Sequence, residues 1–299
     1  AGSLLVISYE EFLDGGRDFT VLFAPTRTVS LAGVTAARHH VILTLLDDVK
    51  NRVELATAPS RSDSGADDDG GWTRASLELA HDGGGVGTFD SVAVAGIDPR
   101  EGDDLWVTTA GFLTPSTLLR VGLDAAGGVT AVEKLKSLPS FFDAAGMEVS
   151  QHFATSADGT RVPYFQVSPA GLAGPAPALL GGYGGFEIAN LPGYSPGLAK
   201  AWLTRGGVYA LANIRGGGEY GPAWHQAALK ANRHRAYEDF AAVARDLVAT
   251  GITTADRLGV RGGSNGGLLT GNMLTQYPEL FGAVVIQVPL LDMRRYSQL

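Results

Sequence analysis

Gly262-Gly263-Ser264-Asn265-Gly266-Gly267 is the stretch that decides the fold of the second half of this chain. It is a G-x-S-x-G motif, preceded by a short predicted strand at residues 258–260 and followed by a predicted helix from about Leu268 to Tyr277 that ends before Pro278. In this strand–turn–helix context a serine lies on a tight bend at the end of a strand, with its hydroxyl exposed. We therefore predict that Ser264 is a nucleophile.

The residues around Ser264 suit that chemistry. Gly262 and Gly266, two positions away on either side, lack the Cβ atoms that would collide in so sharp a bend. The following helix directs its amide-rich N-terminus at the site, where the N–H of Asn265 can stabilise a developing oxyanion. The alternative is a glycine-rich turn with an incidental serine, which the matching context makes the weaker interpretation.

Strands and helices alternate around the motif. Compact apolar runs at residues 178–180 and 208–212 are typical of strands buried on both faces, and a further strand is predicted at residues 283–288. This alternation predicts a parallel sheet covered by helices on both sides. One apolar helix face precedes the predicted stop at Gly251; its residues are Phe240, Val243, Ala244, Leu247 and Val248.

The first half of the chain has a different pattern. Short β-rich runs are separated by polar, glycine-rich turns, and no helical period of any length occurs. Consecutive antiparallel strands of this kind are typical of a sandwich or a propeller, and about three four-stranded blades of ~40–50 residues would fit. The predicted strands lie at residues 20–23, 40–45, 52–55, 91–94, 105–108 and 118–121.

The two patterns meet between Phe141 and Gly146, and a hairpin signal follows at once. Residues 149–155 and 161–167 flank a turn at Asp158-Gly159. We therefore expect two domains, at residues 1–142 and 143–299.

Composition limits the function further. A net charge of −8, from 31 acidic and 23 basic residues, argues against a nucleic-acid binder, because phosphates need clustered Lys and Arg. The absence of cysteine excludes disulfides, thiol nucleophiles and thiolate metal sites. No apolar stretch approaches the ~18 residues of a membrane helix. The polar segment from Ser60 to Gly71 lacks the ligand spacing of a calcium loop, so we expect a solvated loop there and no metal or cofactor in the protein.

A second glycine-rich segment, Gly216 to Gly221, satisfies the dinucleotide-binding pattern G-x-G-x-x-G only formally. Tyr220, Pro222 and Trp224 crowd the place where a phosphate-binding helix would begin. A shaped surface loop is the preferred interpretation.

The general base for Ser264 is missing from its expected place. In strand–turn–helix hydrolases an acid and then a histidine follow the serine, but only Glu279 and Asp292 do so here. All six histidines precede Ser264, and His225 or His234 acting as its base is the weaker alternative. We favour a truncated chain, because a sheet ending one strand after the serine would leave an edge uncovered.

Several longer motifs, in this order and spacing, resemble the prolyl oligopeptidase family of serine peptidases. The match is strong from about Phe142 onward and fainter before it, at residues 47–51 and 112–116. The motifs are Gly182-Tyr183-Gly184-Gly185-Phe186, Asn213-Ile214-Arg215-Gly216-Gly217-Gly218-Glu219-Tyr220-Gly221, Trp224-His225 and Gly262 to Leu269.

The resemblance implies an α/β-hydrolase domain, partial here, preceded by part of an all-β propeller that restricts access to short peptides. It implies that Ser264 forms the acyl-enzyme, that the Asn265 N–H and the Tyr183 hydroxyl are the oxyanion donors, and that Phe186 lines the proline pocket. Asn265 at the bend favours the proline-specific branch over relatives that cleave after basic residues. A packed loop tyrosine remains the alternative for Tyr183, and a core aromatic for Phe186.

From this resemblance we expect an internal piece of a longer serine endopeptidase that cleaves short proline-containing peptides after proline. The family's Asp and His would lie past Leu299, so the piece alone should be inert. We expect the parent to be monomeric and cytoplasmic, without membrane or nucleic-acid partners. A sister oligopeptidase or esterase of different specificity, and a catalytically dead propeller scaffold, remain alternatives.

Overall fold

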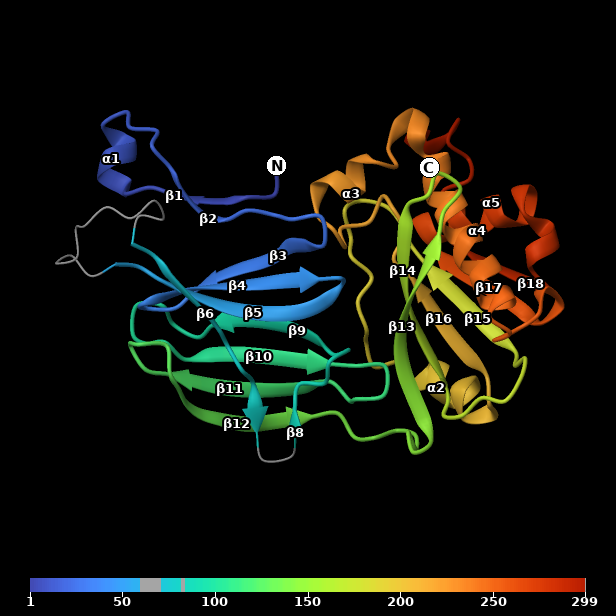
Figure 1. Cartoon of the computed structure of the whole chain (residues 1–299), viewed down its shortest axis with the longest axis horizontal. Coiled ribbons are helices and arrows are strands. Elements are labelled where there is room, and N and C mark those ends of the chain that lie inside the picture. Colours follow the sequence, from blue (N-terminus) through green and yellow to red (C-terminus); the bar gives the residue numbers. More distant parts are fainter. Residues whose placement is uncertain (60–70, 82–83, 299) are drawn as a thin grey trace. The chain divides into compact units, whose positions relative to one another are not determined.

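The computed structural model describes residues 1–59, 71–81 and 84–298 (Figure 1). The chain divides into two compact units. Unit 1 comprises residues 1–111 and 115–138, and unit 2 comprises residues 112–114 and 139–299. The loop predicted from Ser60 to Gly71 falls almost entirely on residues 60–70, which lie outside the described residues.

Unit 1 contains two four-stranded antiparallel sheets, in the orders β3-β4-β5-β6 and β12-β11-β10-β9. Neighbouring strands in each sheet are consecutive in the sequence, so the sheets are consistent with part of a β-propeller. Two short pairs, β1-β2 and β7-β8, complete the described strands. Their bounds are β1 (Leu4–Val6), β2 (Thr20–Phe23), β3 (Val29–Ala36), β4 (His40–Asp47), β5 (Lys50–Thr57), β6 (Thr73–Ser76), β7 (Ala80–His81), β8 (Gly84–Gly85), β9 (Ser91–Gly96), β10 (Leu105–Ala110), β11 (Thr117–Leu123) and β12 (Val129–Ser137).

Strand β4 shows why some strands of unit 1 have mostly apolar sequences. Ile42 packs into a core shared with the second sheet, whereas Leu43 and Leu45 pack on the opposite face against β2. Both faces of β4 are therefore buried, and its residues from Val41 to Leu46 are apolar except for Thr44, instead of alternating. The shared core also contains Val53, Leu55, Val92, Leu105, Val107, Leu119 and Val121.

Unit 1 also holds a helix that the sequence pattern did not predict. Helix α1 (Tyr9–Leu13) is five residues long, and the Ser8 hydroxyl accepts a hydrogen bond from the N–H of Glu11 at 3.1 Å. The expectation of no helix in this half was wrong, because one capped turn is too short to show a 3.6-residue period.

Unit 2 is built on a six-stranded sheet in the order β13-β14-β16-β15-β17-β18. The first three strands are antiparallel neighbours, and β16, β15, β17 and β18 are parallel. Parallel neighbours need crossovers, which the helices between them provide (Figure 1). The strand bounds are β13 (Met147–Thr155), β14 (Arg161–Pro169), β15 (Ala178–Gly182), β16 (Val208–Ala212), β17 (Leu258–Gly263) and β18 (Ala283–Gln287).

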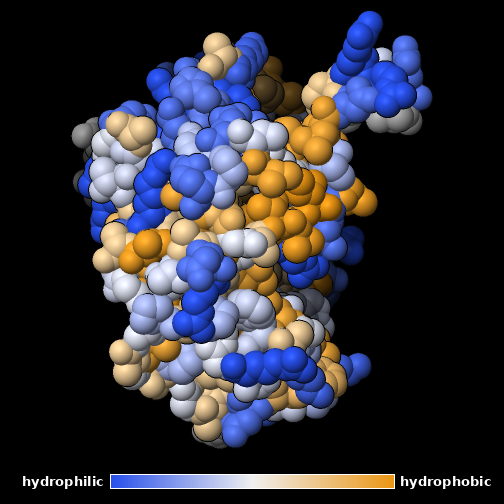
Figure 2. Space-filling model, turned by 90° about the vertical axis from the view of Figure 1, so that its right-hand side faces the viewer, coloured by the Kyte–Doolittle hydropathy of each residue, from blue (hydrophilic) through white to orange (hydrophobic). Residues whose placement is uncertain are grey.

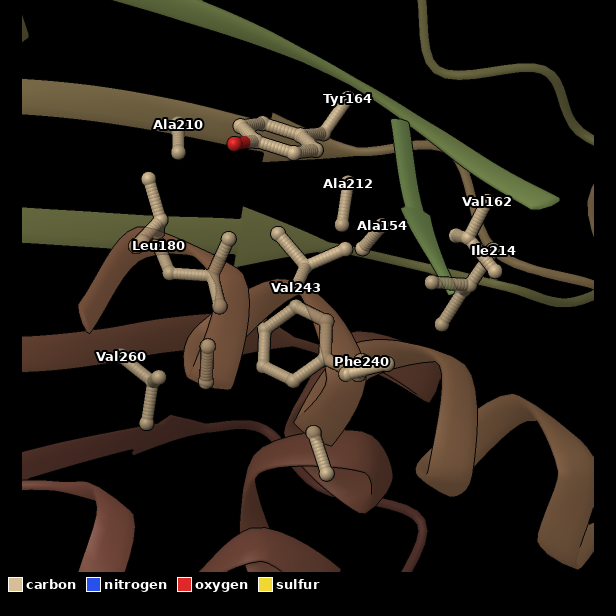
Figure 3. Close-up of a cluster of buried hydrophobic side chains, with 14 of the residues drawn as sticks. Ala154, Val162, Tyr164, Leu180, Ala210, Ala212, Ile214, Phe240, Val243 and Val260 are labelled. Carbon is tan, nitrogen blue, oxygen red and sulfur yellow. The ribbon is translucent and has the colours of Figure 1, made fainter. Parts of the chain in front are cut away.

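Helices α4 and α5 pack against one face of this sheet, whereas α2 contributes Leu198 to the opposite face. In Figure 3, Phe240 and Val243 of α4 point toward sheet residues such as Leu180, and all three are 0% exposed. The predicted apolar face of this helix is thus confirmed at four of its five positions, while Val248 is half-buried. The helices are α2 (Pro196–Ala201), α3 (Pro222–Gln226), α4 (His234–Ala249) and α5 (Asn265–Gln276), and the short 3-10 turns are η1 (Leu203–Arg205), η2 (Lys230–Asn232), η3 (Ala255–Arg257), η4 (Pro278–Leu280) and η5 (Tyr296–Gln298).

The hairpin between β13 and β14 matches its prediction. Ser156 and Thr160 close the turn through a 2.8 Å backbone hydrogen bond, and Gly159 has a φ of +82°. A left-handed φ is the reason that glycine suits this position. The turn places Asp158 at the end of the sheet where β16 also ends, since Tyr164 of β14 pairs with Ala212.

Strand β18 lies at one edge of the sheet and pairs with β17. Apolar side chains are exposed in this part of the chain, and Figure 2 shows apolar surface on the corresponding side of unit 2. The exposed residues are Leu274, Val285, Val288, Leu291 and Met293.

Candidate active site

Ser264 lies between β17, which ends at Gly263, and α5, which begins at Asn265. Its φ of 56° and ψ of −118° are rarely adopted by residues with a Cβ atom, and such strain costs about 1–3 kcal/mol. Two backbone hydrogen bonds hold the conformation: Ser264 donates to the Gln287 carbonyl, and its own carbonyl accepts from Leu268, both at 3.0 Å. The bend is therefore imposed by its surroundings.

Glycines make the bend possible. A Cβ on Gly262 would lie 2.0 Å from the Gly266 carbonyl oxygen, and one on Gly266 would lie 2.9 Å from the Gly182 carbonyl oxygen. The prediction that a Cβ atom at Gly262 or Gly266 would collide in the bend is thus confirmed.

The Ser264 hydroxyl is left available. Serine at a helix N-cap normally accepts a hydrogen bond from the first turn, but Ser264 makes no such bond. Within the described residues no other group hydrogen-bonds its Oγ, and the side chain is half-buried. Beside it, the N–H of Asn265 is one of the first amides of α5, which have no intrahelical partner. A hydroxyl and an amide donor therefore lie at the same helix end.

Tyr183 follows the last residue of β15, and its loop runs against the bend. Its carbonyl oxygen accepts a hydrogen bond from Asn265 Nδ2 at 2.6 Å. The tyrosine ring is half-buried, 6.4 Å from the Phe186 ring between centroids, and in the described part of the chain its hydroxyl makes no hydrogen bond. The sheet order thus brings Tyr183 and Ser264, 81 residues apart in sequence, to the ends of neighbouring strands.

Phe186 is not buried in the core, so the alternative interpretation of Phe186 as a core aromatic was wrong. Its side chain is 64% exposed, and both Phe186 and Glu187 have a positive φ, 57° and 58°. A strained backbone that presents a large apolar side chain to solvent is typical of a binding loop.

The Asn265 side chain contacts the protein itself. Besides donating to the Tyr183 carbonyl, its Oδ1 accepts a 3.2 Å hydrogen bond from Arg233 Nη2. Arg233 also donates through Nη1 to the Gly184 carbonyl. The amide therefore ties the bend to the Tyr183 loop.

The segment from Asn213 to Gly217 is buried, so the interpretation of Gly216 to Gly221 as a surface loop was wrong. Arg215 makes two hydrogen bonds to the Asp239 carboxylate, at 2.9 and 2.6 Å, and a third to Asp158 at 2.5 Å. The hydrogen bond from Arg215 holds the pKa of Asp158 well below its ordinary value. These paired charges allow the loop to be buried.

Glu219, two residues after this segment, is fully buried. Burial raises its pKa to about 7, although hydrogen bonds from the Asn190 N–H and the Asn213 amide act in the opposite direction. Glu219 is thus a carboxyl group that titrates near neutral pH behind the Tyr183 loop.

Neither histidine considered as a base contacts Ser264. Nδ1 of His225 lies 2.7 Å from the Gly216 carbonyl and 3.1 Å from the N–H of Glu187, and Nδ1 of His234 lies 3.1 Å from the Ala231 carbonyl. Of the two downstream acids, Asp292 pairs with Arg295 at 2.6 Å. The described residues therefore place no acid–base partner on the Ser264 hydroxyl.

A cavity of about 600 Å³ lies beside the bend, on the sheet face opposite the α4 core. Tyr183, Gly262 and Gly263 line its end nearest to Ser264, which is not itself among the lining residues. In the described residues there is no group of three His, Asp or Glu side chains that could hold a metal ion. None of the described helices is long and apolar enough to cross a membrane.

Sequence reasoning placed Arg215 and Glu219 in a family motif without giving either a role, and it did not identify Arg233 or the pairing of Arg215 with its carboxylates. One signal was available: Arg215 and Glu219 are charged residues in a glycine-rich stretch that follows a buried strand. Arg233 gave no such signal, because its partners are 32 and 49 residues distant.

Comparisons with known proteins identify relatives in sequence and in fold. Residues 194–299 match the model of the prolyl oligopeptidase family. An uncharacterised peptidase of Sinorhizobium fredii is 46% identical over 93% of this chain and 36% of its own length. A prolyl endopeptidase of Elizabethkingia miricola is 37% identical over 65% of this chain and 27% of its own length. The solved structure of a post-proline cleaving enzyme from Rickettsia typhi superposes with a TM-score of 0.83 and 33% identity, over 100% of this chain and 41% of that one.

The chain thus spans little more than a third of the length of the first of these relatives. By the matched segment, the sequence identities and the shared fold, the chain belongs to the prolyl oligopeptidase family.

Proposed function

We propose that the gene product containing this chain is a serine peptidase that hydrolyses short peptides on the carboxyl side of proline. The observation that carries this proposal is Ser264, held at a φ of 56° with its hydroxyl unbonded at the start of α5. A strained backbone maintained by its surroundings is common at catalytic positions and has no evident structural use here.

In the proposed reaction the Ser264 oxygen attacks the carbonyl carbon of the scissile bond, and its proton passes to a general base. The carbonyl oxygen becomes an oxyanion, which the Asn265 N–H and the Tyr183 hydroxyl stabilise. The amine then leaves with the proton, and water hydrolyses the acyl-enzyme. Removing one oxyanion donor typically lowers turnover about 10²–10³-fold.

The general base is, on this proposal, a histidine oriented by a carboxylate, both from outside residues 1–299. The support is that His225 and His234 are engaged with backbone groups away from Ser264. The chain by itself would then turn over no substrate.

The proposed architecture has about three propeller blades in residues 1–142 and part of an α/β-hydrolase domain in residues 143–299. The two four-stranded antiparallel sheets of unit 1 support two such blades, and the parallel strands with their helical crossovers support the hydrolase assignment. A propeller would restrict entry to short peptides. Monomeric state and cytoplasmic location remain predictions.

Specificity for proline is supported by Phe186, whose exposed ring could pack against a pyrrolidine, and by Asn265 at the bend. A sister oligopeptidase or esterase of different specificity is the second candidate, because the relative from S. fredii carries no specificity in its name. A catalytically dead scaffold is the third.

A fluorophosphonate probe tests the proposal on the complete gene product. We expect covalent labelling that the Ser264→Ala variant abolishes, and stronger competition by a peptide ending in proline than by the matched peptide ending in lysine. Labelling with preference for lysine would support the sister enzyme. An intact, folded product that takes up no label would support the scaffold.

A further inference from the structure

Arg233 links the Ser264 bend to the loop that carries Tyr183. It precedes the first residue of α4, and its guanidinium donates through Nη1 to the Gly184 carbonyl and through Nη2 to Asn265 Oδ1. Two acceptors from two separate strand ends are thus held by one rigid group. A planar guanidinium can make both bonds in fixed directions, whereas an ammonium is a single point charge on a flexible stem.

The contact closes a ring of four residues. Arg233 binds the carbonyl of Gly184, Gly184 is joined covalently to Tyr183, and the Tyr183 carbonyl accepts from Asn265 Nδ2 at 2.6 Å. Asn265 returns to Arg233 through its Oδ1. Both proposed oxyanion donors, the Tyr183 hydroxyl and the Asn265 N–H, belong to residues of this ring.

The surroundings leave the ring little room to rearrange. A Cβ on Gly185 would lie 2.5 Å from Asn265 Nδ2, and one on Gly216 would lie 2.4 Å from the Gly184 oxygen and 3.0 Å from Arg233 Nη1. The Tyr237 ring packs 5.4 Å from the guanidinium carbon. Removing the guanidinium would take the hydrogen-bond donor from both the Gly184 carbonyl and Asn265 Oδ1, and would leave only the bond from Asn265 Nδ2 to the Tyr183 carbonyl between the bend and the loop.

Helix electrostatics do not explain the charge, because cations are disfavoured at a helix N-terminus. Arg235, two residues later, offers a matched comparison. It is also half-buried, and its Nη1 donates to the Ala227 carbonyl at 3.3 Å, with no contact to the bend or to the Tyr183 loop.

We propose that Arg233 is a positioning residue, which holds the Tyr183 hydroxyl and the Asn265 N–H at the spacing that an oxyanion requires. This inference rests on the proposed function of Ser264. Arg233 touches no reacting atom; it acts through the carbonyl of Gly184 and the side chain of Asn265. Its loss should therefore weaken binding of the transition state more than binding of the substrate.

The test uses the complete gene product with Arg233→Gln, Arg233→Lys and the control Arg235→Gln. For Arg233→Gln we expect kcat/KM for a proline-ended peptide to fall about 10–100-fold, with KM changed little, since misplaced donors cost turnover first. Arg233→Lys should recover part of this loss. Arg235→Gln should stay within about twofold of wild type.

A matched pair of inhibitors separates positioning from general damage. A peptide ending in prolinal forms a hemiacetal whose oxygen occupies the oxyanion position, while the same peptide ending in prolinol cannot. We expect Arg233→Gln to weaken prolinal binding about as much as kcat/KM, and prolinol binding less than about twofold. The comparison of the two inhibitors on one preparation does not depend on the fraction of protein that is folded.

The outcomes are distinguishable. A wild-type product without labelling or cleavage would remove the proposed function itself. An active wild type with an equally active Arg233→Gln variant would overturn only the role of Arg233. Equal weakening of prolinal and prolinol binding, or an equal loss in Arg235→Gln, would also overturn that role.

Discussion

Two serines at helix N-termini, one in each unit, show how differently the two regions use the same group. Ser8 precedes α1 in an extended conformation, with a φ of −66°, and its hydroxyl caps the N–H of Glu11. Ser264 precedes α5 with a φ of 56° and caps nothing. In unit 1 the Ser8 hydroxyl stabilises the helix that it precedes, whereas in unit 2 the Ser264 hydroxyl makes no such hydrogen bond. An unused hydroxyl on a strained backbone is a better indication of chemistry than its position in a helix.

Arginine–carboxylate pairs differ in the same way. In unit 1, Arg120 pairs with Asp104 on the surface, and their side chains are 50% and 35% exposed. In unit 2, Arg215 pairs with Asp239, and their side chains are 4% and 0% exposed. Unit 2 thus buries polar groups behind the strand ends that carry Tyr183 and Ser264. Matched substitutions in the two units can show whether this burial sets them apart energetically.

The largest effect is expected from Arg215→Met. This change leaves the buried Asp239 carboxylate without its partner, and breaking a buried pair costs about 3–5 kcal/mol of stability. Arg120→Met removes an exposed pair and should cost only a small fraction of that. Urea unfolding of both variants measures the difference, and equal losses would remove the contrast between the units.

Glu219 should make stability depend on pH. Its folded-state pKa of about 7 lies above its ordinary value of 4.5, so between these values the folded protein binds more protons than the unfolded one. The free energy of unfolding should therefore fall as pH rises through that window, by about 3 kcal/mol in all. Glu219→Gln should remove this slope.

The control for Glu219 is Glu133→Gln, which changes an exposed side chain on β12 of unit 1 and should leave the slope in place. Urea unfolding at a series of pH values between 4.5 and 7 gives the measurement. An unchanged slope in Glu219→Gln would assign the pH dependence to another group.

Gly262→Ala tests the close approach at the bend. The Cβ of the alanine would lie 2.0 Å from the Gly266 oxygen, so the backbone must move. We expect the variant to lose about 2–3 kcal/mol of stability and to lose fluorophosphonate labelling as well. In Gly263→Ala the nearest atom would be 3.9 Å away, so that variant should stay within about 1 kcal/mol of wild type. Equal stability of both variants would mean that the bend tolerates a side chain at Gly262.

The smallest effects concern the two serines themselves. Ser8→Ala removes a cap and should destabilise unit 1 by about 1 kcal/mol. Ser264→Ala removes no cap and keeps a Cβ on the strained backbone, so its stability should change by less than about 0.5 kcal/mol. Thermal unfolding compares them, and a large loss in Ser264→Ala would indicate a structural role for its hydroxyl.

Much of the secondary structure could be predicted from local patterns. The strand at residues 208–212, the hairpin around Asp158-Gly159 and the strand–turn–helix around Ser264 follow from hydrophobic period and turn residues. Prediction failed at several short or charged segments, and it also missed β3 (Val29–Ala36), which is eight residues long and carries no charge. Strand β12 carries few apolar residues and was missed, α1 has a single turn, and α5 begins three residues before its predicted start because glycines 266 and 267 obscured the helix.

The sequence by itself identified the bend, because its serine and glycines occupy six neighbouring positions. The tertiary structure holds the bend in its strained conformation, through the hydrogen bond from Ser264 to the Gln287 carbonyl. The spacing of apolar residues likewise determined the alternation of strands and helices in unit 2. Only the tertiary structure decided which distant groups meet there. Parallel strands out of sequence order bring Tyr183, Arg233 and Asn265 together. Burial makes the pairing of Arg215 with Asp239 matter for stability, and it raises the pKa of Glu219. Contacts between residues many positions apart leave no local pattern, so one sequence read along its length does not contain them.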